Sequence, residues 1–436
     1  MNRWINALVM MLFLGVFTGI ASGVPLEQWN KTYGGTGENH AVYAGQIEDG
    51  SYILAGYAGA SQAGRFVWLI KTDTIGNILW NRSFNREDYN TASSARQTTD
   101  GGYILSGYIG PNTSSYKAWL VKTDSNGNEE WNKTFGISGF DVAYSVQQSL
   151  DGGYIIAGKK RSPAYPMSDE GFDAWLIKTD ANGSKMWNKT FGGTRRDEIA
   201  SIRLTSDGGY ILAGGTDSYR GSWGDAWLVK VDKNGNEQWN RTYYSANSIA
   251  QTASSALETA DSGYIIAGII FPMVDGPQSR MSSDAWLIKT DSTGNEQWNK
   301  TFGGKGETRA LSIVQVSDGG YVLAGDTSSY GANGVDALLV KTDEKGNEQW
   351  NLTFGGKFRD EANSVSQTKD GGYILAGSTM SFGSGDWNGW LIKVSGEPMG
   401  TAAAPTPGQT EKAAGFEVVL ATASLSAVYI FSWKRG

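Results

Sequence analysis

Short apolar runs, each bounded by glycine or by a polar turn, recur along most of the chain. The clearest unit is 370–377, in which Asp-Gly-Gly precedes Tyr-Ile-Leu-Ala and a closing glycine. Each such unit is followed by a Trp-Leu-Ile-Lys-Thr-Asp-like run and a Trp-Asn-Lys-Thr-Phe-like run. Runs this short, with glycine at both ends, predict β-strands joined by tight turns. The tyrosine of the unit stands at Tyr52, Tyr103, Tyr154, Tyr210, Tyr264, Tyr321 and Tyr373.

Each repeat predicts four antiparallel strands, A to D. Strand A is expected at 362–368, strand B at 373–376 and strand C at 390–393, while strand D is clearest earlier, at 129–135. Four strands in a period of about 50 residues are typical of a propeller blade. The shorter, regular coils of a β-helix, which has no hairpins, do not fit this pattern.

The ends of the repeat array predict how the fold closes. The array begins with a lone strand D and ends with strands A, B and C, so 27–33 can complete the last unit. Such closure removes exposed sheet edges. We therefore expect an all-β, seven-bladed propeller over 24–394, with the small residues of strand A innermost.

Two recurring sets of residues are expected to stabilise the blades. The strand C aromatics should be core residues, since large rings suit the space where blades diverge; they are Trp68, Trp119, Trp175, Trp227, Trp286 and Trp390, with Leu338 in the remaining unit. The strand C lysines should run along the neighbouring blade to a carboxylate or carbonyl; they are Lys71, Lys122, Lys178, Lys230, Lys289, Lys341 and Lys393.

Composition narrows the function classes. Aromatic residues make up 12% and charged residues 19%, which is not a disordered composition. The net charge of −7 and the lack of basic runs in the repeats argue against nucleic acid as a partner. Cysteine is absent, which excludes disulfides and thiol chemistry, and His40 is the only histidine. A repeated histidine-based catalytic set is therefore excluded.

Both ends of the chain predict targeting segments. Residues 1–23 combine a basic start, an apolar run and small residues, which indicates a secretory signal peptide; an uncleaved anchor is the alternative. A Pro/Ala/Thr linker at 395–412 precedes a segment at 413–436 whose apolar run is followed by Lys434-Arg435. That segment is long enough for a transmembrane helix, so we expect a surface-anchored protein with an extracellular propeller.

Candidate ligand-binding residues lie in the variable B–C loops, because variable loops on a constant scaffold usually carry binding. The alternative is that their aromatics only pack the loops. They are Tyr165, Tyr219, Trp223, Phe271, Tyr330, Phe382 and Trp387.

Two further sets of polar residues are candidate sites. A ring before strand A includes Asp141, Asp197 and Asp360, which could hold Ca²⁺ at the channel rim or, alternatively, cap turns and bind water. No other cofactor is expected. Glycosylation sequons recur after the strand D tryptophans, with an edge hydrogen bond as the alternative role for the asparagine; the sequon asparagines are Asn30, Asn81, Asn112, Asn132, Asn182, Asn188, Asn240, Asn299 and Asn351.

Three resemblances to known families follow from these motifs. The Asp-Gly-Gly-Tyr-Ile and Trp-Asn-Lys-Thr-Phe-Gly-Gly units resemble tandem-repeat surface proteins of methanogenic archaea, which implies a cell-surface setting. The Gly-Phe and apolar tail at 415–433 resembles the archaeal Pro-Gly-Phe sorting signal, although Ala414 stands where proline is usual. The turn at 124–128 distantly resembles the docking motif of quinoprotein propellers, which implies a fold and no activity.

These observations favour an extracellular binding or adhesion module, or a surface-coat component, that contacts a surface glycan or protein. The alternative is a secreted propeller enzyme, either a carboxylate-based glycan hydrolase or lyase or a quinoprotein-like one. No catalytic motif in the sequence supports that alternative.

Overall fold

The computed structural model describes most of the predicted repeat array. It covers residues 24–35, 37–60, 64–87, 89–111, 115–136, 139–161, 171–219, 224–273, 282–330, 334–384 and 386–397. The predicted signal peptide, most of the linker and the predicted C-terminal segment lie outside these ranges. The described ranges contain no helix with the length and hydropathy that a membrane span requires.

Every regular element within the described ranges is a β-strand. Apolar and β-branched residues dominate the strands, and glycine-containing turns separate them. The strands are β1 (Glu27–Tyr33), β2 (Glu38–Gln46), β3 (Tyr52–Ala60), β4 (Gly64–Thr72), β5 (Ile78–Phe84), β6 (Tyr89–Gln97), β7 (Tyr103–Gly110), β8 (Lys117–Thr123), β9 (Glu129–Phe135), β10 (Val142–Gln148), β11 (Tyr154–Arg161), β12 (Phe172–Thr179), β13 (Lys185–Phe191), β14 (Asp197–Leu204), β15 (Tyr210–Thr216), β16 (Asp225–Val231), β17 (Glu237–Tyr243), β18 (Ser248–Glu258), β19 (Tyr264–Pro272), β20 (Asp284–Thr290), β21 (Glu296–Phe302), β22 (Thr308–Gln315), β23 (Tyr321–Thr327), β24 (Asp336–Thr342), β25 (Glu348–Phe354), β26 (Asp360–Gln367), β27 (Tyr373–Thr379) and β28 (Asn388–Val394).

The strands pair in repeated four-stranded antiparallel groups. Separate sheets contain β10–β13, β14–β17, β18–β21 and β22–β25. Strands β2–β9 form one larger sheet, but a single parallel bridge between Arg65 and Tyr89 is all that joins β4 to β6. We therefore treat β2–β5 and β6–β9 as two groups.

The first strand of the chain belongs to the last group. β1 pairs antiparallel with β28, with Trp29 opposite Lys393 and Tyr33 opposite Gly389. The sheet order is therefore β1-β28-β27-β26. This pairing agrees with the expectation that 27–33 complete the final unit.

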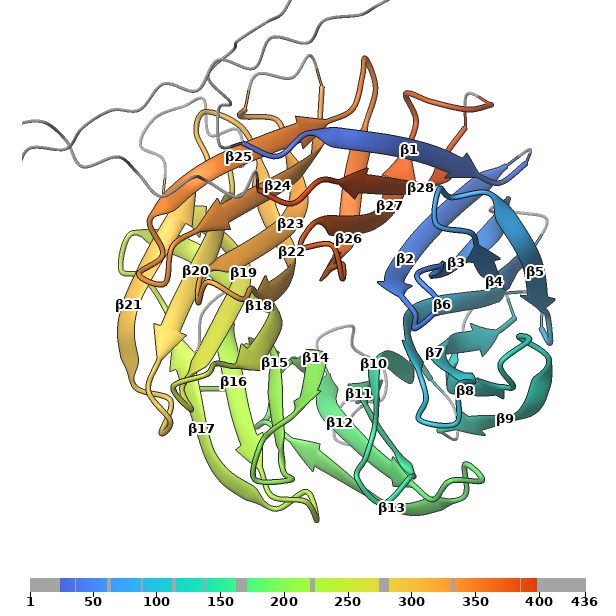
Figure 1. The fold of residues 1–436 in the computed structure, drawn as a ribbon. Coiled ribbons are helices and arrows are strands. Elements are labelled where there is room, and N and C mark those ends of the chain that lie inside the picture. The colour runs from blue at the N-terminus through green and yellow to red at the C-terminus, as the bar shows by residue number, and fades with distance from the viewer. Residues whose placement is uncertain are drawn as a thin grey trace, which may run out of the picture. The chain divides into compact units, whose positions relative to one another are not determined.

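The groups lie around a common centre, with the first strand of each group innermost and the fourth outermost (Figure 1). The first and last groups contact each other directly, since the backbone N–H of Asn39 donates to the carbonyl of Trp387 at 2.8 Å. The N–H of Ala44 likewise donates to Ser364 Oγ at 3.1 Å. The arrangement is propeller-like.

The hydrophobic core is divided into layers between neighbouring groups. One layer joins Leu54 of β3 to Ile374 and Leu391 of the last group, and all three side chains are fully buried. The predicted strand C aromatics and Leu338 are all buried, which confirms their assignment to the core. Burial of apolar area contributes roughly 25 cal/mol per Å², so these layers hold adjacent groups together.

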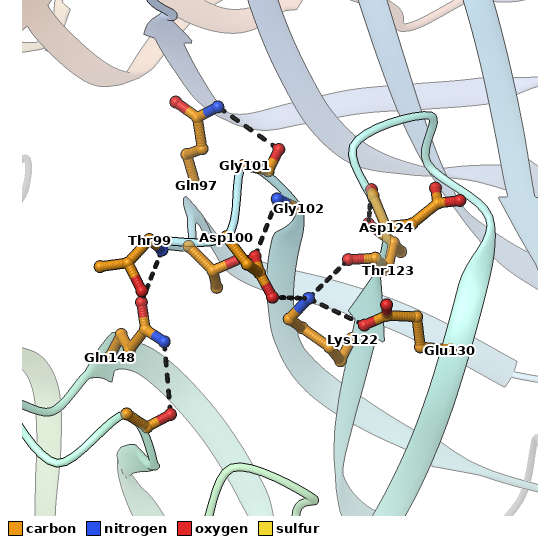
Figure 2. Close-up of polar contacts among 12 residues, drawn as sticks. Gln97, Thr99, Asp100, Gly101, Gly102, Lys122, Thr123, Asp124, Glu130 and Gln148 are labelled. Carbon is orange, nitrogen blue, oxygen red and sulfur yellow. Dashed lines mark hydrogen bonds and ion pairs between the residues drawn. The ribbon is translucent and has the colours of Figure 1, made fainter.

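A lysine–aspartate pair recurs on the side of the glycine turns. Lys122 Nζ lies 2.8 Å from Asp100 Oδ2 and 2.9 Å from Glu130 Oε2, and it donates to the carbonyl of Thr123 at 2.8 Å (Figure 2). The expected carboxylate and carbonyl partners are therefore present. Both belong to the lysine's own group, not to the neighbouring one, because strand C lies beside the hairpin turn that carries the aspartate. The other pairs are Lys71–Asp49, Lys178–Asp151, Lys230–Asp207, Lys289–Asp261, Lys341–Asp318 and Lys393–Asp370.

Candidate functional site: an aromatic pocket on the loop face

The loops between the second and third strands of the groups define one side of the molecule, which we call the loop face. On this face, between β6–β9 and β10–β13, lies a cavity of about 340 Å³. That volume is at the lower end of the range of small-molecule sites. We call this cavity the aromatic pocket; its lining residues are Tyr108, Tyr116, Phe140, Val142, Tyr144, Lys159, Phe172 and Arg196.

Backbone hydrogen bonds between two groups position the rings. The N–H of Tyr116, just before β8, donates to the carbonyl of Gly139 at 2.6 Å, and the N–H of Asp141 donates to the carbonyl of Tyr116 at 3.1 Å. The Tyr116 ring consequently lies 5.1 Å from Tyr108, edge to face, and 5.5 Å from Phe140. Three rings from two groups are thus fixed at one rim of the pocket.

Charged side chains also line the pocket. Lys159 Nζ lies 3.1 Å from Glu198 Oε2, 4.7 Å from the centroid of Phe172 and 5.6 Å from that of Tyr144. A guanidinium nitrogen of Arg196 lies 3.0 Å from the other oxygen of Glu198. Cations over aromatic faces are attracted by the ring quadrupole, so Lys159 is held against the rings.

These charges persist at neutral pH. Burial alone would lower the pKa of Lys159, but the charges and hydrogen bonds of Glu198 and Tyr144 together outweigh it and the pKa is raised. Burial alone would raise the pKa of Glu198, but Lys159 and Arg196 outweigh it and the pKa is lowered. Lys159 and Arg196 are the charged side chains that line the pocket, and the carboxylates of Glu198 and Asp217 lie near them outside the lining. The pocket therefore offers ring faces for stacking and a positive edge for orientation.

The described loop aromatics predicted from the sequence do not meet in this pocket. Tyr219 follows β15, Phe271 lies in β19, and Tyr330 follows β23. Phe382 and Trp387 follow β27. They belong to four different groups and do not line the aromatic pocket. Tyr165 and Trp223 lie outside the described residues.

Three of these predicted residues pack against other rings, two within their own group and one on the first group. Tyr219 lies 5.9 Å from the buried Trp227, and Phe382 lies 5.6 Å from the buried Trp390. The Trp387 ring lies 5.2 Å from His40. These contacts agree with the packing alternative, and a ligand role for these residues stays a prediction.

Sequence reasoning missed the residues that do line the pocket, although a signal was present. The position after the glycine that follows the Tyr-Ile-Leu-Ala-like run varies in chemical type from unit to unit. An aromatic residue there in one unit and a lysine in the next mark the two sides of the pocket. The column reads Tyr57, Tyr108, Lys159, Gly215, Ile269, Asp326 and Ser378.

The predicted acidic ring is dispersed over three groups, and its members have local partners. Asp197 accepts hydrogen bonds from the N–H of Gly193 at 2.9 Å and from Ser218 Oγ at 2.7 Å. Asp360 accepts from the N–H of Gly356 at 2.9 Å and from Ser381 Oγ at 2.6 Å. Asp141 accepts from the N–H of Arg161 at 3.1 Å. Across the described part of the chain, no cluster of three potential metal ligands is found. A calcium site stays a prediction.

The sequon asparagines of the described strands are exposed or half-buried at the outer edges. Several donate to a glutamate three residues earlier, as Asn132 does to Glu129 at 2.7 Å and Asn351 does to Glu348 at 2.6 Å. Asn182 lies in an exposed turn, and Asn112 lies outside the described residues. Whether any sequon carries a glycan stays a prediction.

Comparison with known proteins finds solved structures of similar fold but no family to which the chain can be assigned. No family model matches the chain. Regulatory protein FlaEY of Caulobacter vibrioides is 27% identical over 139 residues, which cover 27% of this chain and only 15% of that protein.

Solved structures that resemble the chain include propellers. The β-propeller domain of the Trilobed protease from Pyrococcus furiosus has a TM-score of 0.41 at 8% identity, covering 82% of this chain and 93% of that one. An α-L-arabinanase of Penicillium chrysogenum has a TM-score of 0.46 at 10% identity, covering 70% and 93%. Drosophila Plexin A has a TM-score of 0.46 at 7% identity, covering 85% and 87%. Likeness at this level carries no argument about ligands.

Proposed function

We propose that the chain is a closed seven-bladed β-propeller that is displayed outside the cell and acts as a binding module. The pairing of β1 with β28 and the packing of the first group on the last support closure. The basic-apolar start at 1–23 supports export, and the apolar run at 416–433 supports a surface anchor.

The aromatic pocket is the observation that carries this proposal. Apolar ring faces contact the C–H faces of sugars, while charged and amide groups at the edge orient their hydroxyls. The pocket combines the Tyr116, Tyr108 and Phe140 rings with the Lys159 and Arg196 cations in a cavity of about 340 Å³, which is within the range of small-molecule sites. The ligand class that fits best is therefore a glycan.

The charge of the pocket adds a preference for acidic over neutral sugars. Because the charged side chains that line the pocket, Lys159 and Arg196, are both cations, a sugar that carries a carboxylate gains an attraction that a neutral sugar lacks. This attraction is screened by salt. Acidic oligosaccharides should therefore bind more tightly than neutral ones, and the difference should shrink as salt is added.

A titration of the purified protein with neutral and uronate-containing oligosaccharides tests the proposal. We expect saturable binding by isothermal titration calorimetry and recovery of the oligosaccharide unchanged by mass spectrometry. A shortened or unsaturated product would instead support the hydrolase or lyase alternative.

Two further results would contradict the glycan proposal. One is the absence of saturable binding to every oligosaccharide. The other is oligosaccharide binding that survives loss of the pocket rings. Self-association of the protein under the same conditions, without oligosaccharide binding, would favour a surface-coat component.

A further inference from the structure

A second, unrepeated feature lies in the innermost strands, four residues before the aspartate of each hairpin turn. Arginine occupies this position in two units and glutamine in the unit between them, whereas the remaining units have small or apolar residues or serine. The repeat itself therefore does not require a cation here. The column reads Gly45, Arg96, Gln147, Arg203, Leu257, Val314 and Ser366.

The three polar residues of this column converge. With its amide oriented to satisfy both neighbours, Gln147 of β10 accepts hydrogen bonds from Arg96 Nε at 3.2 Å and from an Arg203 NH group at 2.9 Å. Arg96 also donates to the carbonyl of Ala95 at 2.8 Å and lies 4.9 Å from the Tyr43 centroid. One neutral amide oxygen thus bridges two guanidinium groups.

Neither guanidinium has a carboxylate partner among the described residues. The carboxylates of the nearby hairpin turns are already paired with the strand C lysines. Within the described ranges no ion pair of Arg96 or Arg203 is found, whereas Arg65, Arg86, Arg196, Arg309 and Arg359 each form at least one.

The two guanidinium groups repel each other, and each lowers the tendency of the site to hold two protons. The charge of Arg96, followed by burial, lowers the pKa of Arg203 to about 9. Burial likewise lowers the pKa of Arg96, with a partial offset from Tyr43. An anion placed between the two side chains would reverse the repulsion.

Space for such an anion exists in the central channel. Arg96 and Arg203 line a cavity of about 250 Å³, together with Tyr43 and with serines that include Ser93 and Ser145. A water molecule takes about 30 Å³ in the liquid, so the cavity can hold a small anion and several waters. The serine hydroxyls can donate hydrogen bonds, and guanidinium groups bind oxyanions in a bidentate manner.

We propose that the central channel binds a small oxyanion, or the carboxylate or phosphate group of a larger ligand, between Arg96 and Arg203. This site is distinct from the aromatic pocket, although Tyr144 lines both cavities. The proposal does not depend on the ligand of that pocket.

Calorimetric titration with phosphate, sulfate, acetate and oxalate, at constant ionic strength balanced with sodium chloride, tests the site. We expect saturable binding of at least one anion and a melting temperature that rises with its concentration. Tighter phosphate and sulfate binding would indicate a tetrahedral ligand group, and tighter acetate or oxalate binding a carboxylate. Arg96→Gln and Arg203→Val should each weaken binding at least tenfold.

The matched control is Arg241→Gln, which removes the same charge from an exposed outer strand and should leave binding unchanged. Val314 occupies the Arg203 position in another unit, so Arg203→Val should fold. In anion-free buffer it should melt at or above the wild-type temperature, because the repulsion is gone. The absence of saturable binding by all four anions would overturn the proposal. Equal affinity in wild type and both arginine variants would overturn it as well, since the anion would then be adventitious.

Discussion

Replacing Asp100 with asparagine tests the lysine–aspartate pair that recurs in every unit. The substitution removes the negative charge but keeps the oxygen that accepts from the N–H of Gly102 at 2.9 Å. The side chain of Lys122 is only 3% exposed, so its ammonium would retain Glu130 and one backbone carbonyl as partners. The variant therefore isolates the charge of Asp100.

The expected loss of stability follows from these exposures. Removing one partner of a buried ion pair lowers the free energy of unfolding by about 3–5 kcal/mol. The side chain of Asp100 is 56% exposed, so solvent screens the pair and a discounted value of about 2 kcal/mol is appropriate. For a domain of this size about 2 °C is lost per kcal/mol, which gives a melting temperature lower by about 4 °C.

The effect should depend on pH in a defined direction. Burial would raise the pKa of Asp100, but the hydrogen bonds from Lys122 and Thr98 outweigh it and lower the pKa to about 2. A carboxyl group whose folded-state pKa is depressed stabilises the fold above its unfolded pKa of about 4 and loses that contribution as the pH falls through 2. The gap between wild type and variant should therefore narrow between pH 4 and pH 2.

Scanning calorimetry at pH 7 and pH 3 measures both effects. Asp124→Asn is the matched control, because Asp124 is an exposed turn residue. An asparagine there can still accept from the N–H groups of Asn126 and Asn128 and loses only the hydrogen bond from Asn128 Nδ2. Lys122→Met should cost less than Asp100→Asn, because it leaves a half-exposed carboxylate instead of a buried ammonium. A smaller loss for Asp100→Asn than for Lys122→Met would refute this reasoning.

Two further substitutions test other parts of the fold. Asp336 is buried, its Oδ1 has no hydrogen-bond partner among the described residues, and burial together with the charge of Asp360 raises its pKa to about 6. Because a raised pKa penalises the ionised form, Asp336→Asn should stabilise by about 1–2 kcal/mol at pH 7.5 and have little effect at pH 4; destabilisation at pH 7.5 in urea unfolding would contradict this. Gly127→Ala and Gly152→Ala both place alanine at positive φ, 76° and 81°, which costs about 1–2 kcal/mol. Only at Gly127 would the new Cβ lie 2.6 Å from Trp80, so Gly127→Ala should cost clearly more, and equal losses would count against this packing.

Much of the fold could be predicted because each repeat carries its own turn and strand chemistry. The Asp-Gly-Gly turn, the strand after it and the lone N-terminal strand were enough to predict four-stranded units and the pairing of β1 with β28. Strand ends were predicted less well. Strand β27 runs to Thr379, three residues beyond the predicted end at Ala376, because its backbone continues to pair with Gly389 and Asn388. Backbone pairing of this kind does not require apolar side chains, so the hydrophobic pattern does not mark where the strand ends.

The aromatic pocket could not be predicted in the same way, because its rings come from two groups. Tyr116 and Phe140 lie on different loops, and their contact depends on a backbone bridge between groups. The segment between Lys159 and Phe172 contributes both of its ends to the pocket, whereas Tyr108 and Tyr116 come from the neighbouring group β6–β9.

The affinity of the tightest-binding oligosaccharide for wild type, Tyr116→Ala and Tyr219→Ala tests the central claim most directly. Tyr116 lines the aromatic pocket, whereas Tyr219 is 46% exposed on another group of the loop face. Loss of one stacking ring costs about 1.5 kcal/mol, so Tyr116→Ala should raise the dissociation constant about tenfold, and Tyr219→Ala should leave it unchanged. Equal affinities for wild type and Tyr116→Ala would contradict the assignment of the aromatic pocket as the binding site.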